Sequence, residues 1–549
     1  MDMHCAKSIG LFLLLTVCWT EETRGQDVDH PKSITAQQVF DDLVRAIGDG
    51  RTPPQLRLLP HRSQESMQVA WFQPNAHTVT LEERAYDVCA SLGADSLHAL
   101  AWVLGHELAH CYQDHGWVGD FGNGFSDLEV GQTVQALDQY IEKLLEREIQ
   151  ADYFGGFFGY VAGYNTLGVG PEALVRIYGE YGLEDDLQGY PSLVERQEIA
   201  RRSEKQVREL VPVFEAGRYC LLVKRYEEAG RCFGHVGRTF PSREVLNNAG
   251  VACALEALEL FEAGEVRFAY PFELDAATRL RGDWRPQGRA SGRNRRRERL
   301  LQEARGWFER AHGKDPEYVP ADINLAGVAA LQGKVEEAVF LAGRAVELAR
   351  NSGERISLAY ALIMYGIARF NENPAALAAV RHDFAEALDG APALVRINLT
   401  VLDVDVPAEQ EADESGRASD RREQIAGREA GDYQEIIQTP DAVVAVPQAD
   451  RRQRPIEIYV RGEEFGDWLV VEKGLDLLAF LQTRQGYQGQ TARGIRIGQP
   501  LNRVEELYGP PAYRVAGRQG TYHVYDNARI IFQAGADGAV QGWILYESD

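Results

Sequence analysis

The sequence predicts a multidomain protein with an α+β domain, an all-α domain of helical repeats and a small α+β domain at the C terminus. Three observations carry this prediction. An apolar helix follows two short strand-like runs, small and aromatic residues recur at a fixed spacing in the middle of the chain, and alternating strands follow a polar stretch near its end. At 549 residues the chain is also too long for a single hydrophobic core.

The composition is that of a globular protein with an acidic surface. Hydrophobic residues make up 45% of the chain, charged residues 26%, and the formal net charge is −24. We expect no nucleic-acid partner, because phosphate backbones are bound by basic surfaces. One basic stretch, Arg279 to Arg299, contains nine arginines. We interpret it as a solvated loop followed by a helix start, and an anionic partner is the less favoured alternative.

Residues 1–25 are typical of an export signal. Lys7 precedes a short apolar core from Ile9 to Trp19, and cleavage is expected after Gly25. Cys18 resembles a lipobox cysteine only weakly, because a valine precedes it. Export to the periplasm or the medium is therefore favoured over a lipoprotein. No other apolar run reaches the ~20 residues needed to span a bilayer.

The first folded domain is predicted over residues 26–204 and begins with short elements. Thr35 to Ile47 has the pattern of a helix, and a proline-bearing loop at Pro53–Pro54 follows it. Val69 to Phe72 and Thr78 to Leu81 are apolar and β-branched runs around a turn, so we predict two short strands.

The next helix carries the residues that predict chemistry. Ser96 to Leu104 is almost wholly apolar and runs directly into His106, Glu107 and His110. Histidines four residues apart lie on one side of a helix, and neutral imidazoles suit Zn²⁺ with one position left for water. Glu107 beside them can accept a proton from that water. We predict one Zn²⁺ per chain, and two histidines packed in a core helix is the alternative.

A third ligand is expected on a downstream helix between Gln135 and Gly155. Leu137, Ile141, Leu144 and Leu145 form its apolar face. Glu148 and Asp152 continue that face at helical spacing, and a carboxylate on an apolar face is costly unless it is paired or binds metal. Glu148 is therefore the predicted ligand, and Asp152 is expected to accept a hydrogen bond from a ligand histidine. An amphipathic helix with a misplaced glutamate is the alternative.

These residues resemble a known family. The His106-Glu-Leu-Ala-His110 motif followed by Glu148-Ile-Gln-Ala-Asp152 is similar to the gluzincin zinc metallopeptidases of the HtpX, Oma and CAAX-prenyl-protease family. The resemblance covers residues 65–200 by motif. It implies that His106, His110 and Glu148 bind zinc and that Glu107 is the general base.

Two further features follow from the resemblance. The family has a His-Pro pair followed by Arg, and Tyr190-Pro-Ser-Leu-Val-Glu-Arg196 keeps this spacing with Tyr in place of His. Tyr190 is expected to donate to the oxyanion of the intermediate, with Arg196 beside the site. The family also binds an extended substrate along an edge strand, for which Thr78, Val79, Thr80 and Leu81 are the candidates.

Five cysteines remain after the predicted signal is removed. Cys89 and Cys111 form a conceivable disulfide in an exported protein, and the odd total leaves at least one free thiol. No Cys-x-x-Cys pair exists, so no thiolate zinc site is expected.

Residues 205–390 resemble tetratricopeptide repeats. The repeat positions 8, 17, 20, 24 and 32 are filled by Gly217, Tyr226, Ala229, Phe233 and Pro241. The frame recurs at Ala304, Phe308, Ala311 and Pro316 and at Leu325, Gly333, Ala338 and Ala345, with partial starts at Gly250 and Gly366. Small residues let paired helices approach and the aromatic residue fills the gap, so the stacked repeats are expected to offer a concave surface to protein partners. A generic helical bundle is the alternative.

The C-terminal part is predicted as a polar, partly disordered linker over residues 391–454 and a small α+β domain over 455–549. Ile456 to Val460, Trp468 to Val471, Tyr522 to Phe532 and Val540 to Tyr546 have strand patterns, whereas Leu475 to Leu481 has a helical one. A short helix–turn pattern leads from Gly494 through Val504 and Tyr508 to Gly509.

Together these features predict an exported zinc metalloendopeptidase that cleaves envelope or secreted proteins, with repeats that bind the substrate or a partner. Two alternatives remain open. The first alternative is a non-catalytic repeat scaffold or chaperone, and the second is a zinc amidase that acts on cell-wall peptides.

Overall fold

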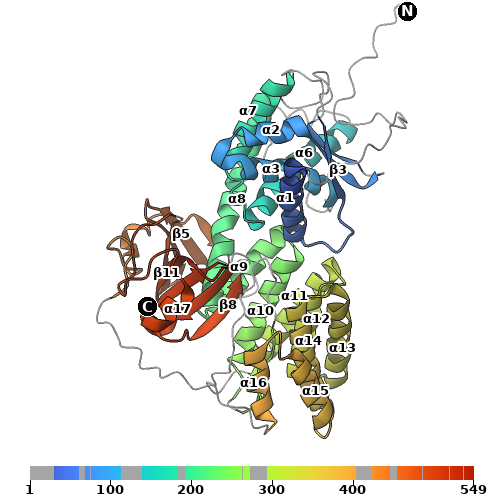
Figure 1. Ribbon diagram of the computed structural model, residues 1–549, viewed down its shortest axis with the longest axis vertical. Coiled ribbons are helices and arrows are strands. Elements are labelled where there is room, and N and C mark those ends of the chain that lie inside the picture. The colour runs from blue at the N-terminus through green and yellow to red at the C-terminus, as the bar shows by residue number, and fades with distance from the viewer. Residues whose placement is uncertain are drawn as a thin grey trace, which may run out of the picture. The chain divides into compact units, whose positions relative to one another are not determined.

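The computed structural model divides into two compact units, Met1–Arg208 and Glu209–Asp549, and the division falls inside one helix. It describes residues 30–60, 69–73, 76–112, 139–183, 192–262, 264–272, 294–402, 422–445, 454–484, 486–517, 520–535 and 537–548, without the side chains of 139–149. The predicted signal, residues 1–25, lies outside this set. The described chain is multidomain, mostly helical up to residue 402, with an antiparallel sheet at its C-terminal end (Figure 1).

The first unit combines helices with a three-stranded sheet. Its elements are α1 (Pro31–Ile47), β1 (Gln55–Leu59), β2 (Ala70–Gln73), β3 (Thr78–Glu82), α2 (Glu83–Ala90), the 3-10 turn η2 (Gly93–Asp95), α3 (Ser96–Tyr112), α6 (Gln139–Val161), α7 (Val169–Tyr181) and the start of α8 (Leu193–Leu222). The predicted helix over 35–47 and both predicted strands are confirmed; the helix and β3 are slightly longer than predicted, and β2 is shifted by one residue. Strand β1, helix α2 and helix α7 were not predicted.

The sheet order β1-β3-β2 makes the predicted edge strand wrong. Thr78 to Leu81 lies in β3, which pairs in parallel with β1 and antiparallel with β2 over all four residues. Both sides of this backbone are therefore occupied by neighbouring strands, and β3 has no open edge for a substrate. The physical reason is β1, whose residues Gln55 to Leu59 follow the proline-bearing loop and reach the far side of β3.

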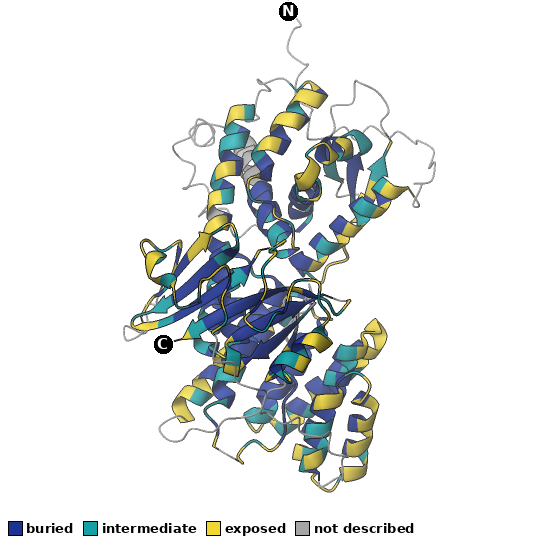
Figure 2. Cartoon of the chain, turned by 60° about the vertical axis from the view of Figure 1, so that its left-hand side comes forward, coloured by how far each residue is buried: buried dark blue, intermediate teal, exposed yellow. Residues whose placement is uncertain are grey.

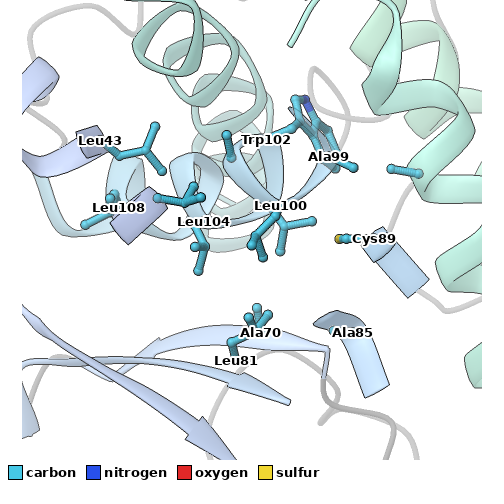
Figure 3. Packing of buried hydrophobic residues seen from close by; sticks show 14 of the residues in the cluster. Leu43, Ala70, Leu81, Ala85, Cys89, Ala99, Leu100, Trp102, Leu104 and Leu108 are labelled. Carbon is cyan, nitrogen blue, oxygen red and sulfur yellow. The ribbon is translucent and has the colours of Figure 1, made fainter. Parts of the chain in front are cut away.

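Helix α3 is buried because its apolar residues cover most of its circumference. Leu100, Leu104 and Leu108, spaced by one turn, point into the core shared with Leu43 of α1 and with the sheet residue Leu81 (Figure 3). Each leucine buried in this way contributes about 2 kcal/mol. Because successive residues turn by about 100°, the histidines of α3 project from the opposite side of the helix. The apolar face thus fixes the helix while its other face carries polar groups.

The second unit begins with a series of antiparallel helices. They are the end of α8, α9 (Tyr226–Thr239), α10 (Arg243–Leu258), α11 (Asn294–Lys314), α12 (Val319–Leu331), α13 (Val335–Ser352), α14 (Arg355–Glu372), α15 (Leu377–Ala387) and α16 (Pro392–Val401). Consecutive helices pack against each other, as Figure 1 shows for α10 to α16. The predicted helix start within the arginine-rich stretch is confirmed at Asn294. There Arg296 bonds to Glu227 and Glu256.

Glycines and phenylalanines meet repeatedly between paired helices. A Cβ atom on Gly217 would lie 3.1 Å from the ring of Phe233, one on Gly250 would lie 2.5 Å from Phe308, and one on Gly366 would lie 2.6 Å from Phe384. These pairs join α8 to α9, α10 to α11 and α14 to α15. In the first two pairs a small and an aromatic position of the predicted repeat frame therefore touch, and the assignment to tetratricopeptide repeats stays a prediction.

The C-terminal sheet has eight antiparallel strands in the order β4-β5-β6-β7-β11-β10-β9-β8. The strands are β4 (Ala442–Val444), β5 (Ile456–Gly462), β6 (Gly466–Lys473), β7 (Asp476–Thr483), β8 (Tyr513–Gly517), β9 (Gly520–Tyr525), β10 (Ile530–Ala534) and β11 (Val540–Ser548), with helix α17 (Leu501–Tyr508) after β7. The predicted strands at 456–460, 468–471 and 540–546 and the short helix are confirmed, whereas the run from Tyr522 to Phe532 is a hairpin of two strands, β9 and β10, joined by the 3-10 turn Asp526–Ala528.

One predicted helix is wrong. Leu475 to Leu481 is not helical, because β7 pairs with β6 on one side and with β11 on the other. Gly474, with φ of +76°, and Leu475 form the two-residue turn of the β6–β7 hairpin. Leucine and alanine favour a helix locally, but pairing on both sides of the strand decides the outcome.

The predicted linker of residues 391–454 is also corrected. Helix α16 extends the helical series to residue 401, and residues 422–445 belong with the sheet, since Ile425 is buried in its core and β4 pairs with β5. Residues 403–421 and 446–453 lie outside the described residues.

Central strands of this sheet are buried on both faces (Figure 2). Trp468, Leu481 and Trp543 face α17 and the segment around Ile425. On the other face, the ring of Phe480 lies 5.1 Å from that of Tyr219, which belongs to α8. The sheet is therefore enclosed between the first helical pair of the unit and its own small helix.

The five cysteines among the described residues are free thiols: Cys89, Cys111, Cys220, Cys232 and Cys253. The conceivable Cys89–Cys111 bridge is therefore not formed. None of the described helices combines the length and the apolar composition that crossing a membrane requires.

Candidate metal centre

Helix α3 presents its two histidines at a spacing that suits one metal ion. The Nε2 atoms of His106 and His110 lie 3.1 Å apart, and their rings meet edge to face with centroids separated by 4.8 Å. Two nitrogens bound to a tetrahedral zinc at ~2.0 Å are about 3.3 Å apart. The predicted pair therefore converges on a common point. Glu107 between them is buried, with 6% of its surface exposed.

Helix α6 comes close to α3 because two glycines face each other where the helices cross. A Cβ atom on Gly155 would lie 2.6 Å from the backbone nitrogen of His106, and one on Gly105 would lie 2.8 Å from the carbonyl oxygen of Gly155. Any side chain at either position would push the helices apart. Gly155 therefore serves close packing of the two helices.

This crossing brings Asp152 of α6 to the histidines. His106 Nδ1 lies 2.8 Å from Asp152 Oδ1, and the side chain of Asp152 is fully buried. When Nδ1 donates this hydrogen bond, Nε2 keeps its lone pair and faces the His110 side of the site. The predicted role of Asp152 as the partner of a ligand histidine is in keeping with this contact.

Helix α8 supplies a second contact to the same carboxylate. Arg196 donates from Nη2 to Asp152 Oδ1 over 3.2 Å, and both residues are buried. The arginine balances the negative charge that Asp152 brings into the core and holds the carboxylate in place. Arg196 was placed near the site by the resemblance alone, and the structure brings it there.

The other carboxylate oxygen, Asp152 Oδ2, is buried and has no hydrogen-bond partner in the described part of the chain. It belongs to a small pocket that Trp102, Thr166, Gly170 and Ser203 also line. The hydroxyl of Ser203 is likewise buried without a partner. Sequence reasoning missed Ser203, since a lone serine on a long polar helix carries no signal.

The donor set of this centre fits zinc as far as it is described. Two imidazole nitrogens converge, and a buried carboxylate orients one of them, which is the usual arrangement around a ligand histidine. Among the described side chains no group of three or more His, Cys, Asp or Glu could hold a metal. Glu148, the predicted third ligand, lies on α6 one turn before Asp152, and its side chain is outside that set.

No described cysteine joins the two histidines in a group of three possible metal ligands. Burial raises the pKa of Cys89 to about 12, and burial raises that of Cys111 to about 11 despite the nearby Arg51. Both thiols are therefore protonated at neutral pH in the metal-free protein. Arg51 instead donates to the carbonyl oxygen of Tyr112 over 3.0 Å, where its charge suits the C-terminal end of α3.

Tyr190 lies outside the described residues, so its place relative to the histidines stays a prediction. No protein-family model matches the chain, and no curated protein has a sequence similar to it.

Proposed function

We propose that the protein is an exported zinc-dependent metalloendopeptidase of the gluzincin type. One observation carries the proposal: two histidines one turn apart converge to 3.1 Å between their Nε2 atoms, and a buried carboxylate on a neighbouring helix binds the far nitrogen of one of them. His106, His110 and Glu148 would hold the metal.

The chain's own residues divide the chemistry. Zinc, when bound, supplies a Lewis acid for the scissile carbonyl and acidifies water. Glu107 accepts the proton of the attacking water and hands it to the leaving amine. Asp152 and Arg196 keep His106 in the tautomer that a metal needs. Tyr190 would donate to the oxyanion.

The substrate strand is reassigned within this proposal. In the described part of the chain β2 pairs only with β3, so its outer edge is open, and it packs against α3. We propose that an extended substrate pairs with β2 rather than with β3. Peptides methylated at alternate amides test this point. Methylation at an amide that pairs with the strand raises KM, whereas equal KM values for every methylated peptide would contradict it.

The base is tested in the full-length protein with Glu107→Gln. This substitution preserves the shape of the side chain and removes its ability to transfer a proton. We therefore expect the zinc content and the melting temperature to equal those of the wild type, and the rate of casein hydrolysis to fall by at least 10²-fold. Glu82→Gln is the matched control, since Glu82 is also buried but accepts a hydrogen bond from Tyr181. Casein cleavage by Glu107→Gln at the wild-type rate contradicts the mechanism.

The metal is tested by elemental analysis of the purified chain. We expect one zinc per chain in the wild type and reduced occupancy in Glu148→Ala. Full occupancy in that variant would move the third ligand to another residue. Zinc in the wild type without cleavage of any protein or peptide would favour the scaffold alternative.

A further inference from the structure

An irregular segment of the second unit, Arg267 to Phe272, is bound by the helical series as a peptide ligand would be. It lies between α10 and α11, and it forms neither helix nor strand. Phe268, Ala269 and Tyr270 are nevertheless buried, with 3%, 4% and 9% of their surfaces exposed. We call this segment the strap.

The backbone of the strap is held by one asparagine side chain. The backbone N–H of Ala269 donates to Asn398 Oδ1 over 2.8 Å, and Asn398 Nδ2 donates to the carbonyl oxygen of Ala269 over 3.0 Å. Asn398 lies on α16 and is fully buried. An amide that satisfies both backbone groups of a single residue recognises an extended chain without regard to its side chains.

Aromatic side chains on either side of Ala269 fill sites on the helices. The ring of Phe268 packs edge to face against the ring of Phe370, with 5.1 Å between the centroids. The guanidinium carbon of Arg267 lies 5.4 Å from the centroid of the same Phe370 ring. Phe272 reaches Gly327, where an added Cβ atom would lie 3.0 Å from its ring.

Most partners of the strap come from three alternate helices, and the ring of Phe268 also lies 6.4 Å from that of Phe384 on α15. Gly327 lies on α12, Phe370 on α14 and Asn398 on α16, and each of α12 and α14 is the first helix of an antiparallel pair. A ligand on the inner face of stacked helical pairs contacts this same subset of helices. The strap therefore crosses the face that such arrays use for binding, and we call this face the groove.

We propose that the groove across α12, α14 and α16 is a peptide-binding site, that the strap occupies it in the resting protein, and that its partner is an extended protein segment with aromatic side chains on both sides of a small residue. The partner competes with the strap for Asn398 and for the Phe370 and Gly327 sites. This inference does not depend on the proposed peptidase activity, because it concerns binding by the second unit.

The tether determines how strongly a partner must bind. A covalently attached segment acts at an effective concentration of roughly millimolar, so a free peptide of equal intrinsic affinity binds the resting chain only weakly. Weakening the strap without altering the groove must raise the affinity for an added peptide.

The test uses the full-length protein and a fluorescent peptide with the strap sequence Arg-Phe-Ala-Tyr-Pro-Phe. A release variant, Phe268→Ser with Tyr270→Ser, should bind this probe at least ten-fold more tightly than the wild type. Adding Asn398→Ala to the release variant should weaken binding at least ten-fold. The control is a probe in which serine replaces the phenylalanine and the tyrosine on either side of the alanine. A folded release variant that binds the probe no better than the wild type overturns the proposal.

Hydrogen exchange of the wild type provides an answer even if the release variant does not fold. The Ala269 amide should exchange faster than the amides of α12 and α14, because strap release is a local opening, and millimolar probe should speed it further. Exchange as slow as in those helices and unaffected by the probe would make the strap a permanent part of the core and overturn the proposal.

Discussion

The two units use glycine in helix crossings for different purposes. At the α3–α6 crossing Gly155 touches backbone, and the two helices come so close that His106 and Asp152 meet. Between α14 and α15 Gly366 instead accommodates the ring of Phe384. The first crossing brings polar groups into contact inside the protein, whereas the second is filled with carbon. At both crossings glycine permits a close approach, and the facing residue decides whether polar groups or only carbon atoms meet there.

Buried carboxylates differ between the units in the same way. Glu228 on α9 is bonded by Arg225 at 3.0 Å and by Lys473 of β6 at 2.8 Å. Burial opposes its ionisation, but these hydrogen bonds hold its pKa at about 2. Asp152 keeps one oxygen without a hydrogen-bond partner among the described residues, whereas both charged groups that bind Glu228 act on its carboxylate. A buried oxygen of this kind calls for an explanation, and a nearby site is one.

The largest effect is expected at the α3–α6 crossing. Gly155→Ala places a methyl group against the backbone of His106, which has no room to yield, so we expect a loss of about 3 kcal/mol in the stability of the first unit and reduced zinc binding. Thermal unfolding and metal analysis measure both. Gly156→Ala is the control, because its Cβ meets only Val207 at 3.9 Å. Equal melting temperatures for the two variants would remove the contrast between the units.

Next in size is the ion pair that joins the helices to the C-terminal sheet. Glu228→Gln removes the buried carboxylate that Lys473 and Arg225 share and leaves them only the more exposed Glu227 and Asp476, so we expect a loss of about 2 kcal/mol at pH 7. Because the folded pKa lies below the unfolded value of 4.5, the wild-type contribution is complete above pH 4.5 and disappears as the pH falls towards about 2. Unfolding measured across this range should show wild type and variant converging in acid. The control is the more exposed Glu227→Gln, and a parallel pair of pH curves for Glu228→Gln and wild type would refute the account.

A smaller effect is expected where glycine faces a ring. Gly366→Ala should cost about 1 kcal/mol, because the ring of Phe384 can shift and alanine is the better helix former. Phe384→Leu replaces the ring by a smaller side chain. In the double variant it should therefore restore part of the stability that Gly366→Ala loses. Additive costs for the two substitutions would mean that the pair does not interact.

The smallest effect is expected at Gly217, where an added Cβ atom would sit 3.1 Å from Phe233 rather than in direct overlap. We expect Gly217→Ala to change stability by less than about 0.5 kcal/mol in either direction. A loss as large as that of Gly155→Ala would show that distance to the facing group does not rank these crossings.

The sequence by itself determined the local elements whose pattern is short and periodic. The apolar run of α3 predicted a buried helix, the four-residue spacing of His106 and His110 predicted their convergence, and the helical spacing placed Asp152 on the inner face of α6. These predictions succeed because residues one turn apart share a face whatever surrounds the helix. The recurring glycine and phenylalanine positions of the second unit could also be predicted, because their spacing along each helix fixes the helix face on which they lie.

Tertiary structure alone decided the features that depend on distant partners. β3 became a central strand because β1, which precedes β2 in the sequence, pairs with it in parallel. β7 became a strand because it pairs with β6 on one side and with β11 on the other. The strap is bound by Asn398, which is 129 residues away from Ala269. The local sequence pattern does not indicate which distant segment will bind the backbone N–H and C=O groups of a given strand or loop. Only the folded chain shows these pairings.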